Sequence, residues 1–123
     1  MGTNSDMGDY LENLKNKMDA YVHFVYKISR SFPKEELYGS NSQFRRATLS
    51  IILNFIEGYA RKRQAVKLNF WETSYGSLKE SKYLLCFAFK ENWITQIEYE
   101  QGLEMAEEIG AMLWKATEAL KDA

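Results

Sequence analysis

The sequence has few residues that could cross-link the chain, bind a metal or interrupt a helix. Its 123 residues include one cysteine, one proline and one histidine. A single cysteine excludes an internal disulfide and a cysteine-based zinc site, and Cys86 lies in an apolar run where we expect a buried structural thiol. A lone histidine, His23, excludes the paired Glu-x-x-His motifs of di-iron bundles. We therefore expect no metal and no cofactor.

Long apolar runs and nucleotide-binding motifs are also missing. No segment reaches the roughly 18 consecutive apolar residues that a membrane span requires. The N-terminal residues 1–8 are polar and lack the apolar middle of a signal peptide. No Gly-rich phosphate loop is present, and no nucleophile–base pair can be recognised. These absences predict a cytoplasmic protein that has no membrane partner and is not an enzyme.

The charges nearly cancel over the whole chain but are unevenly distributed. The formal net charge is −1 at pH 7. Residues 1–90 carry 14 basic and 9 acidic side chains, a net charge of +5, whereas residues 91–123 carry 2 and 8, a net charge of −6. The last part of the chain is therefore strongly acidic, and the rest is basic.

Apolar residues recur every three to four positions, as in helices that bury one face. This periodicity predicts four helices, over about residues 10–31, 40–62, 64–91 and 95–121. Their connections are short, so consecutive helices should run antiparallel. The expected fold is all-α, an antiparallel up-down-up-down four-helix bundle. It should form one domain over residues 1–123, with residues 1–9 as a disordered tail.

The ends of these helices carry recognisable signals. Pro33 should end the first helix, because the residue before a proline avoids the helical conformation. Ser40 with Gln43, and Thr95 with Glu98, have the spacing of capping boxes, in which each side chain bonds a free backbone N–H of the first turn. These pairs predict where the second and fourth helices begin.

Three stretches are more apolar than a helix on the outside of a bundle requires: residues 21–26, 51–56 and 83–89. Antiparallel folding places all three toward the end that holds the first and third connections. A contiguous apolar patch of this kind rarely faces water in a monomer. The stretches therefore predict a homo-oligomer built through that end. Alternatively, the extra aromatic residues belong to the core, with tyrosine hydroxyls reaching solvent.

A polar stripe follows the second helix at spacings of three and four residues. Opposite it, on the third helix, Gly76 would let the backbones approach or leave room for an amide, and Glu80 would reach the stripe. One interpretation is a hydrogen-bonded network that fixes the register of the two helices; the other is a groove for a ligand or partner. We call this set the polar seam: Arg46, Ser50, Asn54, Glu57 and Arg61, with Gly76 and Glu80.

Basic residues cluster where the second and third helices meet and near the start of the second helix. Such clusters can bind phosphates, and nearby Tyr59, Phe70 or Trp71 could stack on bases. The alternative is an ordinary solvated surface. The candidate residues for binding nucleic acid or a partner are Arg45, Arg46, Arg61, Lys62, Arg63 and Lys67.

Several of these residues lie in recognisable motifs. Residues 31–39, Ser-Phe-Pro-Lys-Glu-Glu-Leu-Tyr-Gly, and residues 42–47, Ser-Gln-Phe-Arg-Arg-Ala, resemble a stretch of the 23S rRNA intervening-sequence protein family, also called four helix bundle proteins. The match continues at residues 50–51, 54–59, 61–62 and 76–80. The resemblance covers about residues 17–121.

The resemblance implies an up-down four-helix bundle that assembles as a homopentamer and has no enzymatic activity. The similar accessory variability determinant of diversity-generating retroelements binds nucleic acid and a reverse transcriptase through a basic pentamer. We therefore expect a non-enzymatic, oligomeric scaffold or adaptor that binds RNA or another nucleic acid. The alternative is a module that docks a partner protein on the oligomer without nucleic acid.

Overall fold

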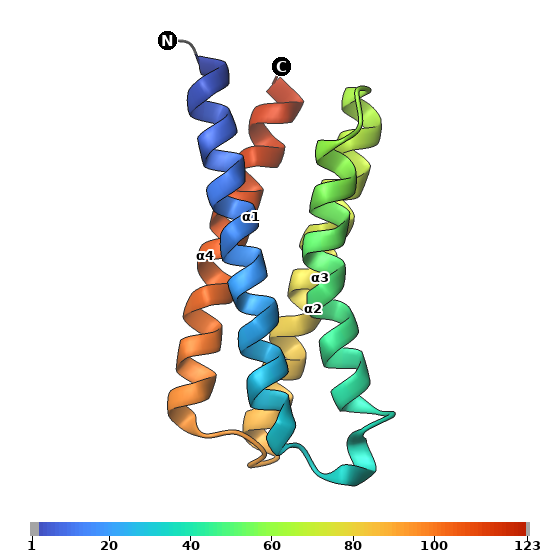
Figure 1. Ribbon diagram of the computed structural model, residues 1–123, viewed down its shortest axis with the longest axis vertical. Helices are drawn as coiled ribbons and strands as arrows, with labels where there is room; N and C mark the ends of the chain where they lie inside the picture. The colour runs from blue at the N-terminus through green and yellow to red at the C-terminus, as the bar shows by residue number, and fades with distance from the viewer. Residues whose placement is uncertain (1–2, 123) are drawn as a thin grey trace.

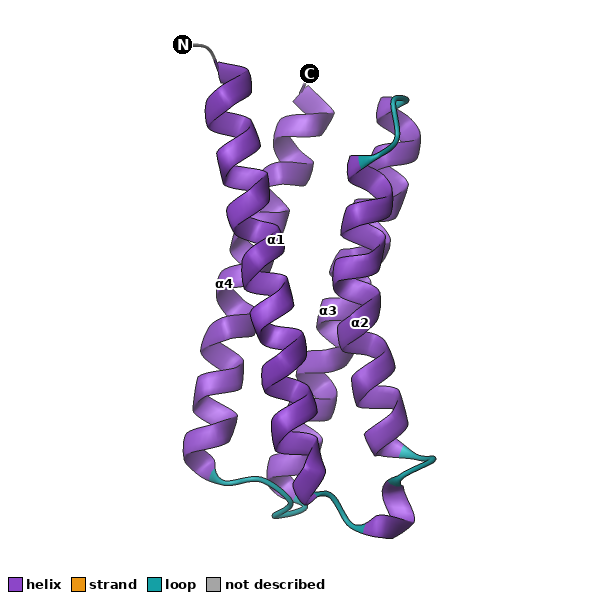
Figure 2. Cartoon of the chain, viewed as in Figure 1, coloured by secondary structure: helices purple, strands orange, loops and turns teal. Residues whose placement is uncertain are grey.

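The computed structural model describes residues 3–122, and for residues 3–5 only the backbone. Its helices are α1 (Thr3–Ile28), α2 (Ser40–Tyr59), α3 (Gln64–Lys90) and α4 (Gln96–Asp122), with two short 3-10 turns, Ser29–Ser31 and Lys34–Glu36, between α1 and α2. Within residues 3–122 there is no strand (Figure 2). Consecutive helices run antiparallel, and the α2–α3 turn lies at the same end as both chain termini (Figure 1). The predicted four-helix bundle is confirmed.

The start of α1 differs from the prediction. Residues 3–9, which the sequence analysis assigned to a tail, form the first turns of this helix, and residues 1–2 lie outside the described part. The helix ends at Ile28, and the 3-10 turn Ser29–Ser31 follows before Pro33. Phe32 leaves this turn with extended backbone angles, as expected for a residue that precedes proline.

Only one of the two predicted capping boxes forms. At the start of α4, the Thr95 N–H donates to Glu98 Oε1 at 2.9 Å, and the Glu98 N–H donates to Thr95 Oγ1 at 3.1 Å. The prediction that Ser40 and Gln43 form a capping box was wrong, because Ser40 is already inside α2. Its N–H and hydroxyl instead donate to Glu36 Oε1, at 3.3 and 2.5 Å. The carboxylate of the preceding turn thus replaces the predicted cap.

The core runs the length of the bundle and draws on all four helices. Its buried polar groups are paired: Tyr21 Oη lies 3.1 Å from Ser81 Oγ, and no buried side-chain nitrogen or oxygen of the described residues lacks a partner. This satisfies the requirement that a polar group removed from water be hydrogen-bonded. The largest fully buried apolar side chains are Leu14, Met18, Tyr21 and Val25 of α1, Phe44, Ile51 and Phe55 of α2, Leu78 and Leu85 of α3, and Ile109 and Leu113 of α4.

Helices α2 and α3 approach closely because small residues lie between them. A Cβ atom at Gly58 would stand 2.5 Å from Trp71 Cδ1, so only glycine fits against this ring. The Trp71 indole N–H in turn donates to the Phe55 carbonyl at 3.2 Å. Further along, Ser74 Oγ donates to the Ile51 carbonyl at 2.6 Å. These contacts fix the register of the α2–α3 hairpin.

The apolar patch predicted at the end of the bundle forms only in part: Leu53, Ile56 and Tyr83 of the three stretches are exposed, whereas most of the other apolar side chains are covered. Tyr21 and Leu85 are buried in the core. Phe87 packs against Trp93 of the third connection with ring centroids 5.6 Å apart, and Phe89 stacks on Tyr99 of α4. The connection and α4 therefore cover most of the run 83–89. Cys86 of that run was expected to be buried but is partly exposed.

Candidate functional site

Exposed apolar side chains concentrate along the outer face of α2. Leu49, Leu53 and Ile56 are spaced by four and three residues, so they share one face of the helix. Leu53 is 58% exposed and Ile56 is 45% exposed. We call these three residues the α2 apolar row. Apolar residues at this spacing are the pattern by which a helix anchors to another helix.

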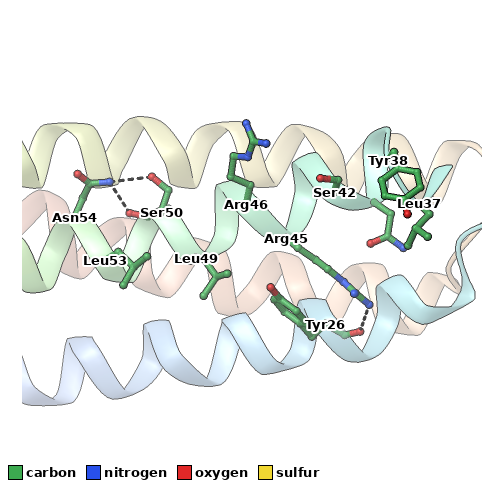
Figure 3. Close-up of a pocket in the computed structure, with 11 residues that line it drawn as sticks. Tyr26, Leu37, Tyr38, Ser42, Arg45, Arg46, Leu49, Ser50, Leu53 and Asn54 are labelled. Atoms are coloured by element: carbon green, nitrogen blue, oxygen red, sulfur yellow. Dashed lines mark hydrogen bonds between the residues drawn. The ribbon is translucent and has the colours of Figure 1, made fainter.

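The α2 apolar row borders a groove between α1 and α2 (Figure 3). The larger part, about 710 Å³, lies toward the first connection and is lined by Tyr26 of α1, Leu37 of the connection and the row residues Leu49 and Leu53. A second hollow of about 280 Å³ lies between Leu11 and Ile56, nearer the α2–α3 turn. Both hollows lie between α1 and α2, and polar side chains also line the larger one: Asn41, Ser42, Arg45, Arg46, Ser50 and Asn54. The groove therefore has a mixed apolar and polar lining.

The two arginines near the start of α2 have different surroundings. Arg45 Nε donates to Ser29 Oγ at 2.8 Å, Arg45 Nη2 donates to the Tyr26 carbonyl at 3.2 Å, and the guanidinium lies 4.5 Å from the centre of the Tyr26 ring. Arg45 thus ties α2 to the end of α1. Arg46 is exposed, has no hydrogen bond or ion pair among the described side chains, and points away from Arg45 (Figure 3). Of the two, Arg46 is available to a partner.

The polar seam is partly a hydrogen-bonded network. Ser50 Oγ lies 2.8 Å from Ser77 Oγ of α3, and Asn54 Nδ2 donates to Ser50 Oγ at 2.9 Å and to its carbonyl at 2.8 Å (Figure 3). Ser77 was not among the residues predicted for the seam. The roles predicted for Gly76 and Glu80 were wrong. Glu80 bonds none of the described seam residues, and open space surrounds the position where a Cβ of Gly76 would lie.

At the α2–α3 turn, two of the four predicted basic residues already have local partners. Arg61 Nη2 lies 2.7 Å from Glu57 Oε2, and its guanidinium lies 5.2 Å from the centre of the Phe70 ring. Lys67 Nζ lies 5.7 Å from the centres of both the Tyr59 and the Trp71 rings. These are cation–π distances, so part of the positive charge at the turn is directed at the protein itself.

Lys62 and Arg63 complete the turn and are exposed. Neither makes a hydrogen bond or ion pair with any side chain that the structure describes. Helix α3 begins immediately afterwards without a side-chain cap from Arg63, so the positive end of its backbone dipole faces the same region. The turn therefore presents free cationic groups beside a helix N-terminus.

Among the described side chains, no group of three or more His, Cys, Asp or Glu residues could hold a metal ion. His23 is exposed on α1, with Nε2 3.4 Å from Asp19 Oδ1. Within the described residues, none of the helices combines the length and apolar character needed to cross a membrane.

Comparison with known proteins identifies the family. Residues 12–115, which include the α2 apolar row and the basic turn, match the family described as 23S rRNA-intervening sequence protein. The chain belongs to this family. No curated protein matches this intervening sequence protein.

A solved structure shares the fold of this intervening sequence protein. It is a protein with unknown function from the S23 ribosomal protein family of Bacteroides thetaiotaomicron VPI-5482. The two sequences are 19% identical, and the structures superpose with a TM-score of 0.82 over 89% of this chain and 98% of the other. At this identity the likeness shows the fold alone.

Proposed function

We propose that this protein is a non-enzymatic adaptor that assembles from several copies and presents its basic turn to RNA. The observation that carries the proposal is the exposure of the α2 apolar row. Fully burying one leucine or isoleucine side chain is worth about 1.5–3 kcal/mol, and Leu53 and Ile56 are each about half exposed in the single chain. Association that covers the row and the groove recovers about half of this free energy for each side chain. The resemblance to the family implies five copies.

Charge at the α2–α3 turn supports RNA as the partner. Lys62 and Arg63 are free, and the ring of Phe70 beside Arg61 offers a surface on which a base could stack. The acidic residues Glu98–Glu108 belong to the half of α4 that starts at the opposite end of the bundle, so they lie away from this turn (Figure 1). An assembly repeats the turn in every copy, and multivalent contact raises the overall affinity.

Reversing the free charges at the turn tests RNA binding. The double variant Lys62→Glu/Arg63→Glu should bind a labelled, mixed-sequence single-stranded RNA at least about tenfold more weakly at low salt, because two cationic contacts become repulsive. The slope of log K against the logarithm of the salt concentration should also become shallower, by about 0.7 for each lost phosphate contact. Fluorescence anisotropy over a salt series measures both quantities.

The matched control reverses two exposed charges at the other end of the bundle, Lys27→Glu/Arg30→Glu. It changes the net charge equally and should retain more affinity than the turn variant. Equal losses in the two variants would show that binding at the turn is not specific. Absence of RNA binding by the unmodified protein at low salt would contradict the RNA part of the proposal.

A second candidate function is docking of a partner protein without nucleic acid. The observation in its favour is that Arg61 and Lys67 are engaged with Glu57 and neighbouring rings, which leaves two free cations at each turn. An oligomer that binds no RNA at low salt would support this function.

A further inference from the structure

The exposed large apolar side chains fall into two groups on opposite edges of the bundle. The backbone of each helix closely approaches the backbones of its two neighbours but not that of the helix diagonal to it, so the α1–α2 edge lies opposite the α3–α4 edge. Met7, at the start of α1, belongs to neither group. The first group is Leu37, Tyr38, Leu53, Ile56 and Tyr59, on α2 and the connection before it; the second is Tyr83, Ile97 and Trp114, on α3 and α4.

Trp114 is the largest member of the second group. It is 54% exposed, and its ring centre lies 5.6 Å from that of Tyr75 on α3. We call these two side chains the Trp114 knob. Tryptophan and tyrosine are enriched among the residues that dominate binding energy in protein interfaces. One edge of the bundle therefore carries a groove in which leucines alternate with polar side chains, and the opposite edge carries an aromatic pair of which Trp114 is exposed.

We propose that copies of this chain join head to tail, with the Trp114 knob of one copy seated in the α1–α2 groove of the next, against the α2 apolar row. This inference rests on the self-association in the proposed function and specifies which faces meet. The occupant of the groove is a second copy of the chain. Two features of the structure support the pairing: the heights of the two surfaces along the bundle, and their charges.

The knob and the row lie at the same height along the bundle. Ser74 Oγ bonds the Ile51 carbonyl at 2.6 Å, so Ser74 and its neighbour Tyr75 are level with Ile51. The ring contact between Tyr75 and Trp114 places Trp114 at this level too. Ile51 lies between Leu49 and Leu53 in sequence. The knob of one copy can therefore meet the row of the next when the two copies are related by a rotation about an axis parallel to the helices. No shift along the helices is needed.

Toward the end of the bundle that holds the first and third connections, Arg46 and Glu107 lie near these apolar contacts. Arg46, which has no partner among the described residues, precedes Ile51 by five positions, about 7.5 Å along the helix. On α4, Glu107 precedes Trp114 by seven positions, about 10.5 Å and two helical turns toward the same end, so it lies on the same face as Trp114. Its carboxylate is exposed and pairs with Lys82 Nζ at 2.9 Å. Seating the knob in the groove thus brings Arg46 toward the Glu107 carboxylate. Such complementarity favours one orientation of the two copies.

Contact between two different faces has a consequence for the assembly. A face that pairs with itself gives a closed twofold dimer, whereas two different faces that pair head to tail give a ring when the rotation closes. In a head-to-tail assembly every chain uses both its groove and its knob. Two variants with different faces destroyed should therefore complement each other.

The test uses two full-length variants, Leu53→Glu in the groove and Trp114→Glu in the knob. Each should have the mass of a single chain by light scattering, because each has lost one of its two contacts. An equimolar mixture should contain a complex of twice that mass, in which the intact knob of the Leu53→Glu chain occupies the intact groove of the Trp114→Glu chain. Met7→Glu, a change at an exposed apolar residue outside both edges, should keep the mass of the unmodified protein.

Other outcomes overturn the pairing. If Trp114→Glu and Trp114→Ala both keep the unmodified mass, the knob is not in the interface. If both single variants are monomeric but their mixture shows no doubled mass, the two faces do not meet. Circular dichroism must show that each variant keeps the helix content of the unmodified protein. If Trp114→Glu loses helix content, Trp114→Ala takes its place in the test. A monomeric unmodified protein would refute the self-association itself, which separates failure of the proposed function from failure of the pairing.

Discussion

Replacing Gly58 with alanine should lower the free energy of unfolding by about 1–3 kcal/mol, the usual cost of overpacking a well-filled interior. The added methyl group would stand 2.5 Å from Trp71 Cδ1 and 2.7 Å from Trp71 Nε1. The indole ring cannot retreat without breaking its hydrogen bond to the Phe55 carbonyl. The close packing of α2 against Trp71 of α3 therefore depends on this glycine. Urea unfolding followed by circular dichroism, at one fixed protein concentration, measures the change.

Gly76→Ala provides the matched control on the other helix of the same hairpin. No heavy atom lies within 4 Å of the position that its Cβ would take. Alanine is favoured over glycine inside a helix by about 1 kcal/mol, so this variant should be more stable than the unmodified protein. Changes of opposite sign in the free energy of unfolding for the two substitutions would support the described packing. A destabilised Gly76→Ala variant, or a neutral Gly58→Ala variant, would contradict it.

Stability should fall steeply between pH 10 and pH 12 because Tyr21 is buried. Burial raises the pKa of Tyr21 from 10.0 to about 12, although the hydrogen bond with Ser81 acts in the opposite direction. Below pH 10 the phenol is protonated in both the folded and the unfolded chain, and its contribution to stability is complete. Above pH 10 the unfolded chain releases the proton while the folded chain retains it, so unfolding becomes easier. A shift of this size corresponds to roughly 3 kcal/mol of stability.

The Tyr21→Phe variant isolates this contribution. Ser81 Oγ still donates to the Leu78 carbonyl at 2.8 Å, so the substitution leaves no unpaired hydroxyl in the core. The free energy of unfolding, measured from pH 9 to pH 12, should decline less in the variant than in the unmodified protein. Parallel curves for the two proteins would show that Tyr21 titrates normally and is not held in the core.

Helix number, order and most boundaries could be predicted because the apolar periodicity is long and regular. The prediction for the third helix, residues 64–91, differs from α3 by one residue. The capping pair of Thr95 and Glu98 forms because no other carboxylate competes for the Thr95 N–H. Ser40 was misassigned because Glu36, only four residues earlier, accepts from it first. The start of α1 was missed because residues 3–9 contain one large apolar residue, Met7, and therefore carry no periodic apolar signal.

The surfaces were harder to predict, because exposure depends on contacts between residues distant in sequence. Counting apolar residues in the run 83–89 could not show that Trp93 and Tyr99 cover Phe87 and Phe89. Likewise, the engagement of Arg45 with the end of α1 is not visible in the local sequence. The spacing of Leu49, Leu53 and Ile56 was present in the sequence, but only the structure shows that this face of α2 lacks a covering helix.

The mass of the unmodified full-length chain in solution tests the central claim most directly. Multi-angle light scattering at micromolar concentration should give a multiple of the 14.4 kDa chain mass, five copies according to the family resemblance. The mass should stay constant on moderate dilution, since the α2 apolar row is covered in the assembly. A single species of 14.4 kDa would contradict the proposal that this exposed face is an interface between copies.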